Sequence, residues 1–323
     1  MRNEDNVRLA VVGKLPDNDH PYSWSAILNG YDALDECPNA IIREYLTAQP
    51  RQNFGIPGVR VTHIWCDDAG DARRVARVSR IPSVVSRAED VLGEVDAVLI
   101  PTDVGHEHLE RTRFFIEANV PVFIDKPLAD CEEHLRQFVR WHRQGKALMS
   151  SSALRYAREF RDCRARQQEI GDLRLLTATT CRSWERYGMH ALEAAYQFVA
   201  AGQWTSVQNT GSNRSNIVHA RHGSGVDVVL AAVEDMDGSL GCVALYGTKG
   251  ACSARFHDSF YAFRAQLADF VSYLRTGIHP YPFAETVELA WLLIAGIRSR
   301  QEGGRAVRLT DFETKTMETP CST

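Results

Sequence analysis

Short apolar runs alternate with amphipathic stretches through the first 127 residues of the chain. The apolar runs have the length of buried strands and cover residues 7–12, 59–66, 82–85, 95–100 and 121–124. Apolar residues spaced three or four apart predict helices between these strands, at about 23–37, 41–46, 71–78, 88–92 and 108–118. Strands that alternate with helices predict an α/β domain with a doubly wound parallel sheet over residues 1–127.

The pattern changes after about residue 150. A helix over 159–169 precedes long strand-like stretches at 173–180, 205–213, 225–234 and 240–247, and helices close the chain at about 263–275 and 284–301. Long strands in succession predict an α+β second domain, residues 128–323, with a large, mostly antiparallel open sheet. Residues 228–233 are apolar at every position, so both faces of that strand look buried. We therefore expect another copy of the chain to cover the outer face, in a homodimer or homotetramer.

Length and composition narrow the class of protein. The 323 residues suit two domains, and a net charge of −4 without a basic cluster argues against nucleic-acid binding. No apolar run approaches the ~18 residues of a membrane span, and the polar start of the chain lacks the apolar stretch of a signal peptide. Eight scattered cysteines without a Cys-x-x-Cys pair are typical of reduced thiols. We therefore expect a cytoplasmic protein with neither disulfides nor a zinc site.

Candidate binding residues follow the predicted parallel strands, because folds of this class bind ligands at the carboxyl edge of the sheet. Asp67 and Asp68 follow the second strand, where a carboxylate accepts hydrogen bonds from an adenosine ribose and repels a 2′-phosphate. This favours NAD over NADP. Thr102 and Asp103 follow the fourth strand and should pass beside the nicotinamide ribose. These residues predict a dinucleotide-binding first domain of the Rossmann type.

The loop after the first strand departs from the usual dinucleotide signature. The motif Gly-x-Gly-x-x-Gly is absent, and only Gly13 remains of it. We expect the longer loop to present the N-terminus of a helix, with Ser23 as its N-cap, to the cofactor pyrophosphate. Trp24, with the aromatic residues His20 and Tyr22, either packs on the cofactor and lines the substrate entrance or fastens the loop to the domain.

Three stretches together resemble the glucose–fructose oxidoreductase and inositol dehydrogenase (Gfo/Idh/MocA) family. Residues 120–129, Val-Pro-Val-Phe-Ile-Asp-Lys-Pro-Leu-Ala, resemble the family's strand ending in Glu-Lys-Pro, with Asp for Glu. Residues 187–193, Tyr-Gly-Met-His-Ala-Leu-Glu, are similar to its Gly-x-His-x-x-Asp segment, with Glu for the final Asp. Residues 246–250, 270–277 and 285–309 are similar to its C-terminal third, which ends in a helix and a Gly-Arg-x-Val strand. The resemblance thus covers nearly the whole chain.

The resemblance implies an NAD(P)-dependent oxidoreductase that transfers a hydride to or from a secondary alcohol or ketone of a sugar, cyclitol or similar polar molecule. It implies that Lys126 binds the reacting oxygen and relays its proton, and that His190 is a general acid/base. It also places Asp125, Lys126 and His108 at the cofactor. The alternative interpretation of Lys126 is a solvated surface residue, or one paired with Asp125. The alternative for His190 is a histidine bonded to backbone at the start of a helix.

Five further residues are candidates for the substrate site. Arg186 stands four positions before the candidate histidine, where the family has an Asp, and a guanidinium suits a carboxylate or phosphate on the substrate. Glu185 and Tyr187 flank it and offer a carboxylate and a phenol. Arg155 and Tyr156 follow three serines, where the family carries substrate-facing residues. They either bind substrate hydroxyls or pack the edge of the sheet.

Two rival functions remain open. One is a redox-neutral enzyme that retains NAD and uses transient oxidation for elimination or epimerisation. The other is a non-catalytic binding or regulatory protein that lost its dinucleotide affinity together with its glycines. A metal site at His106, Glu107 and His108 is not expected, because adjacent residues at a helix start point apart.

Overall fold

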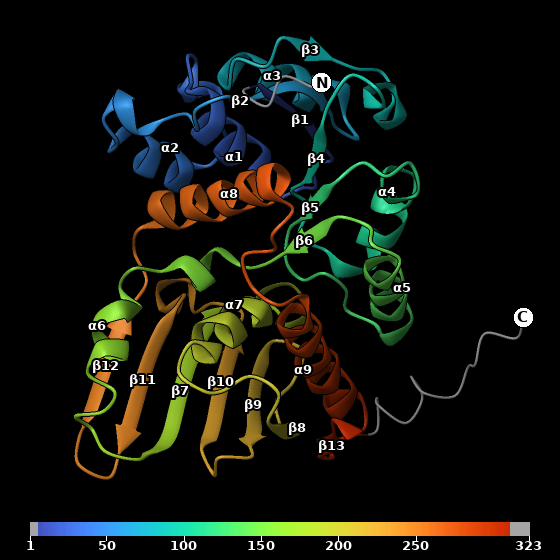
Figure 1. Ribbon diagram of the computed structural model, residues 1–323. Coiled ribbons are helices and arrows are strands. Elements are labelled where there is room, and N and C mark those ends of the chain that lie inside the picture. Colours follow the sequence, from blue (N-terminus) through green and yellow to red (C-terminus); the bar gives the residue numbers. More distant parts are fainter. Residues whose placement is uncertain (1–5, 311–323) are drawn as a thin grey trace, which may run out of the picture. The chain divides into compact units, whose positions relative to one another are not determined.

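A six-stranded parallel sheet forms the centre of the first of two units (Figure 1). The computed structural model describes residues 6–310. In spatial order the strands are β3 (Ser83–Val84), β2 (Val59–Trp65), β1 (Val7–Val12), β4 (Ala97–Ile100), β5 (Val122–Ile124) and β6 (Leu148–Ser150). Every neighbouring pair is parallel, and the order reverses between β1 and β4. The predicted doubly wound sheet is confirmed.

Helices follow the strands of this sheet, as the alternating pattern predicts. They are α1 (His20–Asn29), α2 (Ala40–Thr47), α3 (Ala69–Val78), α4 (Gly105–Glu117), α5 (Glu132–Arg143) and α8 (Ser259–Thr276), with short 3-10 turns η1 (Leu34–Glu36), η2 (Arg51–Asn53) and η3 (Ala88–Val91). Helix α8 packs against α1 and α2 and adds Phe260, Leu267 and Phe270 to the hydrophobic core. The sequence pattern missed α5, because its apolar residues form only a narrow stripe among charged ones.

The first helix differs from its prediction at both ends. It begins at His20, three residues before the expected N-cap Ser23, and it ends at Asn29. Gly30 follows with a φ of +79°, a conformation that favours glycine and ends the helix well before Pro38. Ser23 is fully buried, and its hydroxyl accepts a hydrogen bond from Tyr45. The predicted capping role of Ser23 is therefore wrong.

A seven-stranded mixed sheet forms the second unit. Its spatial order is β12 (Ala251–Arg255), β11 (Cys242–Gly247), β7 (Leu173–Cys181), β10 (Asp227–Val233), β9 (Ser215–His222), β8 (Trp204–Asn209) and β13 (Val307–Arg308). Only the β7–β10 pair is parallel among the neighbours of this described sheet. The predicted open, mostly antiparallel sheet is confirmed. The strands β9 and β12 were missed because polar residues interrupt their apolar ones.

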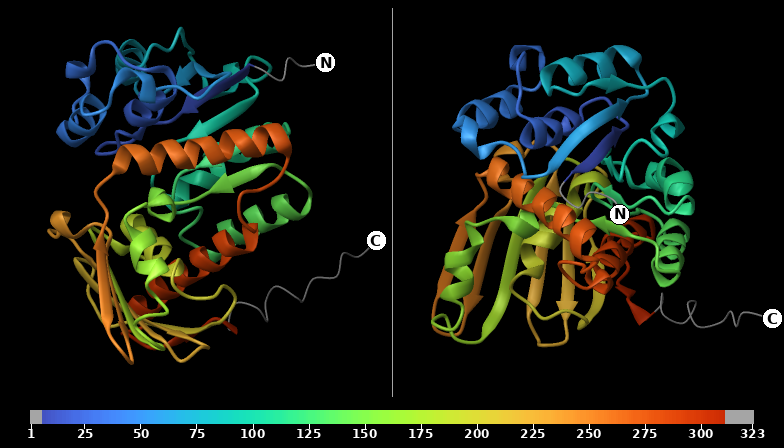
Figure 2. Two further views of the ribbon diagram at one scale, coloured as in Figure 1. Left: turned by 60° about the vertical axis from the view of Figure 1, so that its left-hand side comes forward. Right: turned by 45° about the horizontal axis from the view of Figure 1, so that its top comes forward.

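The helical elements of this unit are η4 (Ala153–Tyr156), α6 (Phe160–Ala165), α7 (Trp184–Tyr196), η5 (Asp237–Ser239) and α9 (Phe283–Gln301). Helix α7 packs on β7 and β10. It covers Val228, Leu230 and Ala232, which are fully buried, whereas Val229 and Ala231 on the other face of β10 are half-buried. In Figure 2 the long helices α7 and α9 lie on one side of the sheet. The outer face is thus exposed within a single described chain.

Each unit takes segments from more than one part of the chain. Unit 1 contains the chain up to Ala129, Arg136–Ser151 and Asp258–Phe283, and unit 2 contains Asp130–Leu135, Ser152–His257 and the chain from Ala284. A single boundary after residue 127 does not describe this division, because α8 returns to the core of unit 1. The polar start of the chain, residues 1–5, and Cys321 lie outside the described residues. Within residues 6–310, no helix combines the length and apolar character needed to cross a bilayer.

Candidate functional site

Gly13 marks the carboxyl end of β1 in unit 1, and its backbone approaches two other elements closely. Its φ is +99°, which favours glycine. A Cβ at this position would lie 3.0 Å from the Thr102 Cγ2 and 3.2 Å from the Arg111 Nη1. The loop after β1 therefore lies against the end of β4 and against the guanidinium of a residue on α4.

The two aspartates after β2 have different partners. The Asp67 carboxylate accepts hydrogen bonds from the Arg111 Nη2 at 3.0 Å and Nη1 at 3.1 Å, and Arg111 Nε also donates to Glu107 at 2.9 Å. Asp67 remains 44% exposed, so it can still accept ribose hydroxyls. Asp68 caps α3 by accepting a hydrogen bond from the Asp71 amide at 2.8 Å. Asp67 and Asp68 are both exposed, so both remain candidates for the ribose.

The start of α1 does not offer free amides to a phosphate. Residues 21–28 are all buried, and Asp19 occupies the N-cap position with its carboxylate 3.6 Å from the Lys14 Nζ. Trp24 is fully buried in the core, where its ring lies 5.2 Å from Phe123 and 5.5 Å from His20. The expected contact of pyrophosphate with amides near Ser23 therefore lacks support, and Trp24 belongs to the core.

Lys126 lies at the end of β5 and is only 2% exposed. Its Nζ forms an ion pair with the Asp103 carboxylate at 3.6 Å. Asp125 accepts a hydrogen bond from the Lys126 amide at 2.8 Å and contacts the His20 ring at 2.7 Å. The Lys126–Pro127 peptide is cis. The reading of Lys126 as a solvated surface residue is therefore wrong.

His108 ties together the loops that follow β4 and β5. Its Nε2 lies 2.7 Å from the Thr102 carbonyl oxygen and its Nδ1 lies 2.8 Å from that of Pro127. Burial lowers the pKa of His108 and outweighs the opposing effect of these carbonyls and of Asp125 and Asp103. The ring therefore joins the loops after β4 and β5.

In unit 2, His190 lies in the middle of α7 rather than at its start. Its Nδ1 lies 2.7 Å from the hydroxyl of Ser152, and the ring of Tyr187 packs edge-on at a centroid distance of 5.2 Å. His190 is 7% exposed. The expected alternative, a histidine bonded to backbone at a helix start, is not what the structure shows, because α7 begins six residues earlier at Trp184.

Arg155 lies between two carboxylates of unit 2. Its Nε is 2.6 Å from Glu193 and its Nη1 is 2.7 Å from Glu285. Burial raises the pKa of Glu193, and the neighbouring Arg155 opposes that rise. Together these three residues line a hollow of about 250 Å³. Tyr156 follows in η4 and is half-buried.

Arg186 and its two sequence neighbours, Glu185 and Tyr187, lie in different environments. Arg186 is one helical turn before His190 on α7, so it occupies the same helical face, as expected for the position of the family's Asp. Glu185 is bonded to Arg300, which also donates to Asn216 at 2.7 Å. Of the two flanking candidates, Tyr187 is therefore the one that contacts His190.

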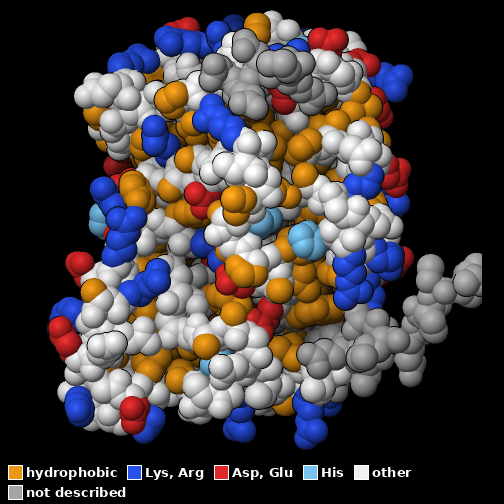
Figure 3. Space-filling view, viewed as in Figure 1, with side chains coloured by type: hydrophobic (Ala, Val, Ile, Leu, Met, Phe, Trp, Pro, Cys, Tyr) orange, Lys and Arg blue, Asp and Glu red, His pale blue; other side chains and the backbone are white. Residues whose placement is uncertain are grey.

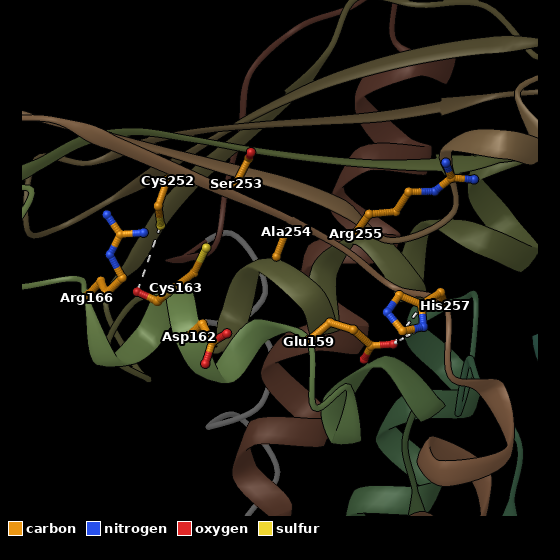
Figure 4. A pocket seen from close by; sticks show the side chains of 9 residues that line it. All are labelled: Glu159, Asp162, Cys163, Arg166, Cys252, Ser253, Ala254, Arg255 and His257. Atoms are coloured by element: carbon orange, nitrogen blue, oxygen red, sulfur yellow. Dashed lines mark hydrogen bonds and ion pairs between the residues drawn. The ribbon is translucent and has the colours of Figure 1, made fainter.

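A larger polar cavity of about 570 Å³ lies between α6 and β12 of unit 2 (Figure 4). Glu159 and His257 pair across one end at 3.4 Å, and Cys252 lies 3.9 Å from the Cys163 carbonyl at the other. Burial raises the pKa of the Cys163 thiol to about 12. No residue predicted from the sequence lines this cavity.

Arg111 and Ser152 are site residues that the sequence analysis missed. The spacing of Arg111 four residues after Glu107 indicates only a helical ion pair, and nothing local indicates Asp67. Ser152 is the last of three serines in a row, a pattern that does not indicate a histidine partner. Both act through residues that are distant along the chain, so no pattern in the sequence could have found them.

The residues of unit 1 fit a dinucleotide. The Thr102 Oγ1 is buried and has no hydrogen-bond partner among residues 6–310, and the space beside Gly13 would be filled by any Cβ. Asp67 is available to a ribose, and Arg111 and Lys14 place two cations near the end of β1 where further glycines are normally found.

On the face shown in Figure 3, basic and acidic side chains are interspersed and form no basic patch.

Residues 39–151 match the model of the Gfo/Idh/MocA family, described as oxidoreductase family, NAD-binding Rossmann fold. A comparison with curated proteins finds no match. A probable dehydrogenase from Thermotoga maritima has TM-score 0.71 and 15% identity, covering 95% of this chain and 100% of its own. For a myo-inositol dehydrogenase from Corynebacterium glutamicum these values are 0.69, 18%, 94% and 99%. For GenD2 from gentamicin A biosynthesis, in complex with NAD, they are 0.70, 17%, 94% and 96%. Identities this low show a shared fold.

Proposed function

We propose that this chain is an oxidoreductase of the Gfo/Idh/MocA family, and that it transfers a hydride to or from a secondary alcohol or ketone of a sugar, cyclitol or related polar molecule. The observation that carries the proposal is the buried Lys126, paired with Asp103 at the carboxyl edge of the parallel sheet. Burying an ammonium group is costly, and such groups cluster at functional sites. The myo-inositol dehydrogenase among the structures of the same fold supports a cyclitol as substrate class.

The roles of the chain's own residues follow from their surroundings. Hydride transfer would be the chemistry that NAD supplies when it is bound. Lys126 holds the substrate oxygen and its proton, and Asp103 holds the ammonium in place at 3.6 Å. His190, fixed by Ser152, is the second proton-handling group, and Arg186 and Tyr187 lie on its helix as candidates for contact with the rest of the substrate.

We assign NAD rather than NADP as the cofactor because Asp67 follows β2 with an exposed carboxylate. Asp67 would bind the ribose hydroxyls, while Gly13, Thr102 and Asp103 would lie along the dinucleotide. Titration calorimetry with each dinucleotide measures this preference. Tighter binding of NADP would contradict the role of Asp67 alone, whereas binding of neither would contradict the proposed function.

We also place the protein in the cytoplasm. The seven cysteines within residues 6–310 are all free thiols, including four that are buried. Thiols persist in a reducing compartment. A fusion with a fluorescent protein, followed by cell fractionation, tests this placement.

Replacement of Lys126 tests the proposed chemistry. Lys126→Met should reduce turnover by roughly 10²-fold or more while leaving the affinity for NAD within about threefold, because a general acid–base group acts mainly in the chemical step. The measurement is the change in nicotinamide absorbance with a panel of cyclitols and sugars. Lys146→Met is the matched control, since within residues 6–310 the Lys146 ammonium donates only to Asn119 and to the Glu117 carbonyl.

Three outcomes would decide against parts of the proposal. Unchanged turnover in Lys126→Met would show that Lys126 has no part in the reaction. Loss of the circular dichroism signal would show that it is structural, and Asp103→Asn would then test the same ion pair with a smaller change. Product without net change in nicotinamide absorbance would show a redox-neutral reaction instead.

A further inference from the structure

Ser152 is held on three sides in unit 2. It caps η4 and is fully buried. Its hydroxyl oxygen accepts a hydrogen bond from the Leu154 amide at 3.1 Å and lies 2.7 Å from the His190 Nδ1. Its own amide donates to the Glu193 carboxylate at 3.2 Å. The position of Ser152 is therefore set by backbone and side-chain contacts together.

The two α7 residues that hold Ser152 lie on one face of that helix. His190 and Glu193 are three residues apart, so their side chains are neighbours on the helix surface. Glu193 is in turn fixed by Arg155 at 2.6 Å, and Arg155 by Glu285 at 2.7 Å. This chain of contacts leaves the Ser152 hydroxyl little freedom except rotation of its hydrogen.

The hydroxyl decides where a neutral His190 ring carries its proton. A serine hydroxyl has one hydrogen to donate and two lone pairs to accept, and one lone pair already takes the Leu154 amide. If the hydroxyl donates to Nδ1, the hydroxyl and Nδ1 both have partners and the ring proton is on Nε2. If Nδ1–H donates instead, the hydroxyl hydrogen has no acceptor, because the only other partners of this oxygen within residues 6–310 are donors. A buried polar hydrogen without a partner is unfavourable.

We infer that Ser152 is a positioning residue that keeps neutral His190 in the Nε2–H form, so that the ring serves as a hydrogen-bond donor rather than as a base. A carboxylate partner would accept Nδ1–H and leave Nε2 free to take a proton. The hydroxyl of Ser152 does the reverse, so Nε2 carries the ring proton and donates it. The catalytic meaning of this inference rests on the proposed function, whereas the position of the ring proton does not.

Nuclear magnetic resonance of protein labelled with ¹⁵N-histidine measures the tautomer directly. The His190 signals are assigned by their loss in His190→Asn, and spectra are recorded at a pH above the titration of the ring. We expect Nε2–H in the wild-type protein and a shift toward the Nδ1–H form in Ser152→Ala. Ser152→Thr, which keeps the hydroxyl, should restore the wild-type spectrum.

Ser183→Ala is the matched control, because Ser183 caps the same helix through its hydroxyl and lies seven residues before His190. It should leave the tautomer unchanged. Turnover of Ser152→Ala should fall by roughly 10- to 100-fold, since a misplaced catalytic group costs about that much. The wild-type spectrum needs no variant to fold, and an Nδ1–H ring in it would overturn the inference. An unchanged tautomer in Ser152→Ala would do the same.

The two proposals fail separately. If wild-type protein shows Nε2–H but neither binds a dinucleotide nor turns over any substrate, the proposed function is wrong and the role of Ser152 in setting the tautomer stands. If turnover is found and the ring is Nδ1–H, the proposed function stands and His190 is a base without the help of Ser152.

Discussion

The role of a buried polar residue in this chain depends on the groups that its side chain contacts. Its position in the sequence does not fix those contacts. Asp125, Lys126 and Asp103 were all expected near the cofactor, and the structure pairs Lys126 with Asp103. Asp125 instead contacts His20 and the adjacent amide. The residue types could be predicted from the strand ends, but the pairing could not.

His108 should make the stability of the protein sensitive to acid. Its folded pKa lies below the unfolded value of about 6.5, because the charged ring is costly to bury. The unfolded chain therefore binds the proton first, and stability that is present above about pH 6.5 is lost as the pH falls below it. His108→Gln lacks this titration. The difference in free energy of unfolding between wild type and His108→Gln should therefore shrink by up to about 1.4 kcal/mol for each unit by which the pH falls.

Urea unfolding between about pH 5 and 8 measures that difference. His106→Gln is the control, since His106 lies near the start of the same helix and its side chain is exposed. Parallel stability curves for wild type and His108→Gln would show that His108 does not titrate differently in the folded state.

Among the secondary-structure elements, α1 shows how a prediction from local sequence can misplace the start of a helix. Its pattern of apolar residues was recognised, but its start was set at a serine that the fold buries. A serine before an apolar stretch usually caps a helix, yet here helices α2 and α8 cover that side of α1. Ser23 is therefore a packed residue inside α1 and not its N-cap.

Trp24→Ala distinguishes a core role from a cofactor role for this helix. Removing a fully buried indole should lower the free energy of unfolding by about 3–5 kcal/mol. Chemical denaturation measures it, and Trp65→Ala, at a half-buried strand end, should cost less. A variant of normal stability that has lost affinity for NAD would show that Trp24 contacts the cofactor after all.

At the scale of the molecule, the outer face of the unit 2 sheet carries the expectation of an oligomer. Val229, Ala231 and Val233 are half-buried there, and Ile217, which pairs with Ala231 on β9, is 41% exposed. Apolar and small side chains in adjacent strands leave water-exposed area that a second copy can cover. Homo-oligomerisation remains a prediction.

Light scattering at micromolar concentration should give two or four times the chain mass of 36.2 kDa. Ile217→Glu should return the protein to a single chain, because a carboxylate would be buried unpaired in the interface. Ile41→Glu is the control, as Ile41 is 70% exposed on α2 of the other unit. A wild-type mass of one chain would refute the oligomer.

The two sheet types, and the residues that stand at the ends of their strands, could be predicted from sequence patterns alone. Periodicity is local, so alternating strands and helices identify the parallel sheet, and its topology then brings Gly13, Asp67, Thr102 and Lys126 to one edge. Sequence similarity to a family also indicated hydride transfer before any geometry was known.

The contacts between these residues depend on how distant segments of the chain pack together. Arg111 meets Asp67 across 44 positions of sequence, and Ser152 meets His190 across 38. Neither separation is a helical or strand repeat, so no local pattern encodes the contact. The proton on a histidine ring depends on which group its other nitrogen faces, and that group is chosen by the packing of distant segments.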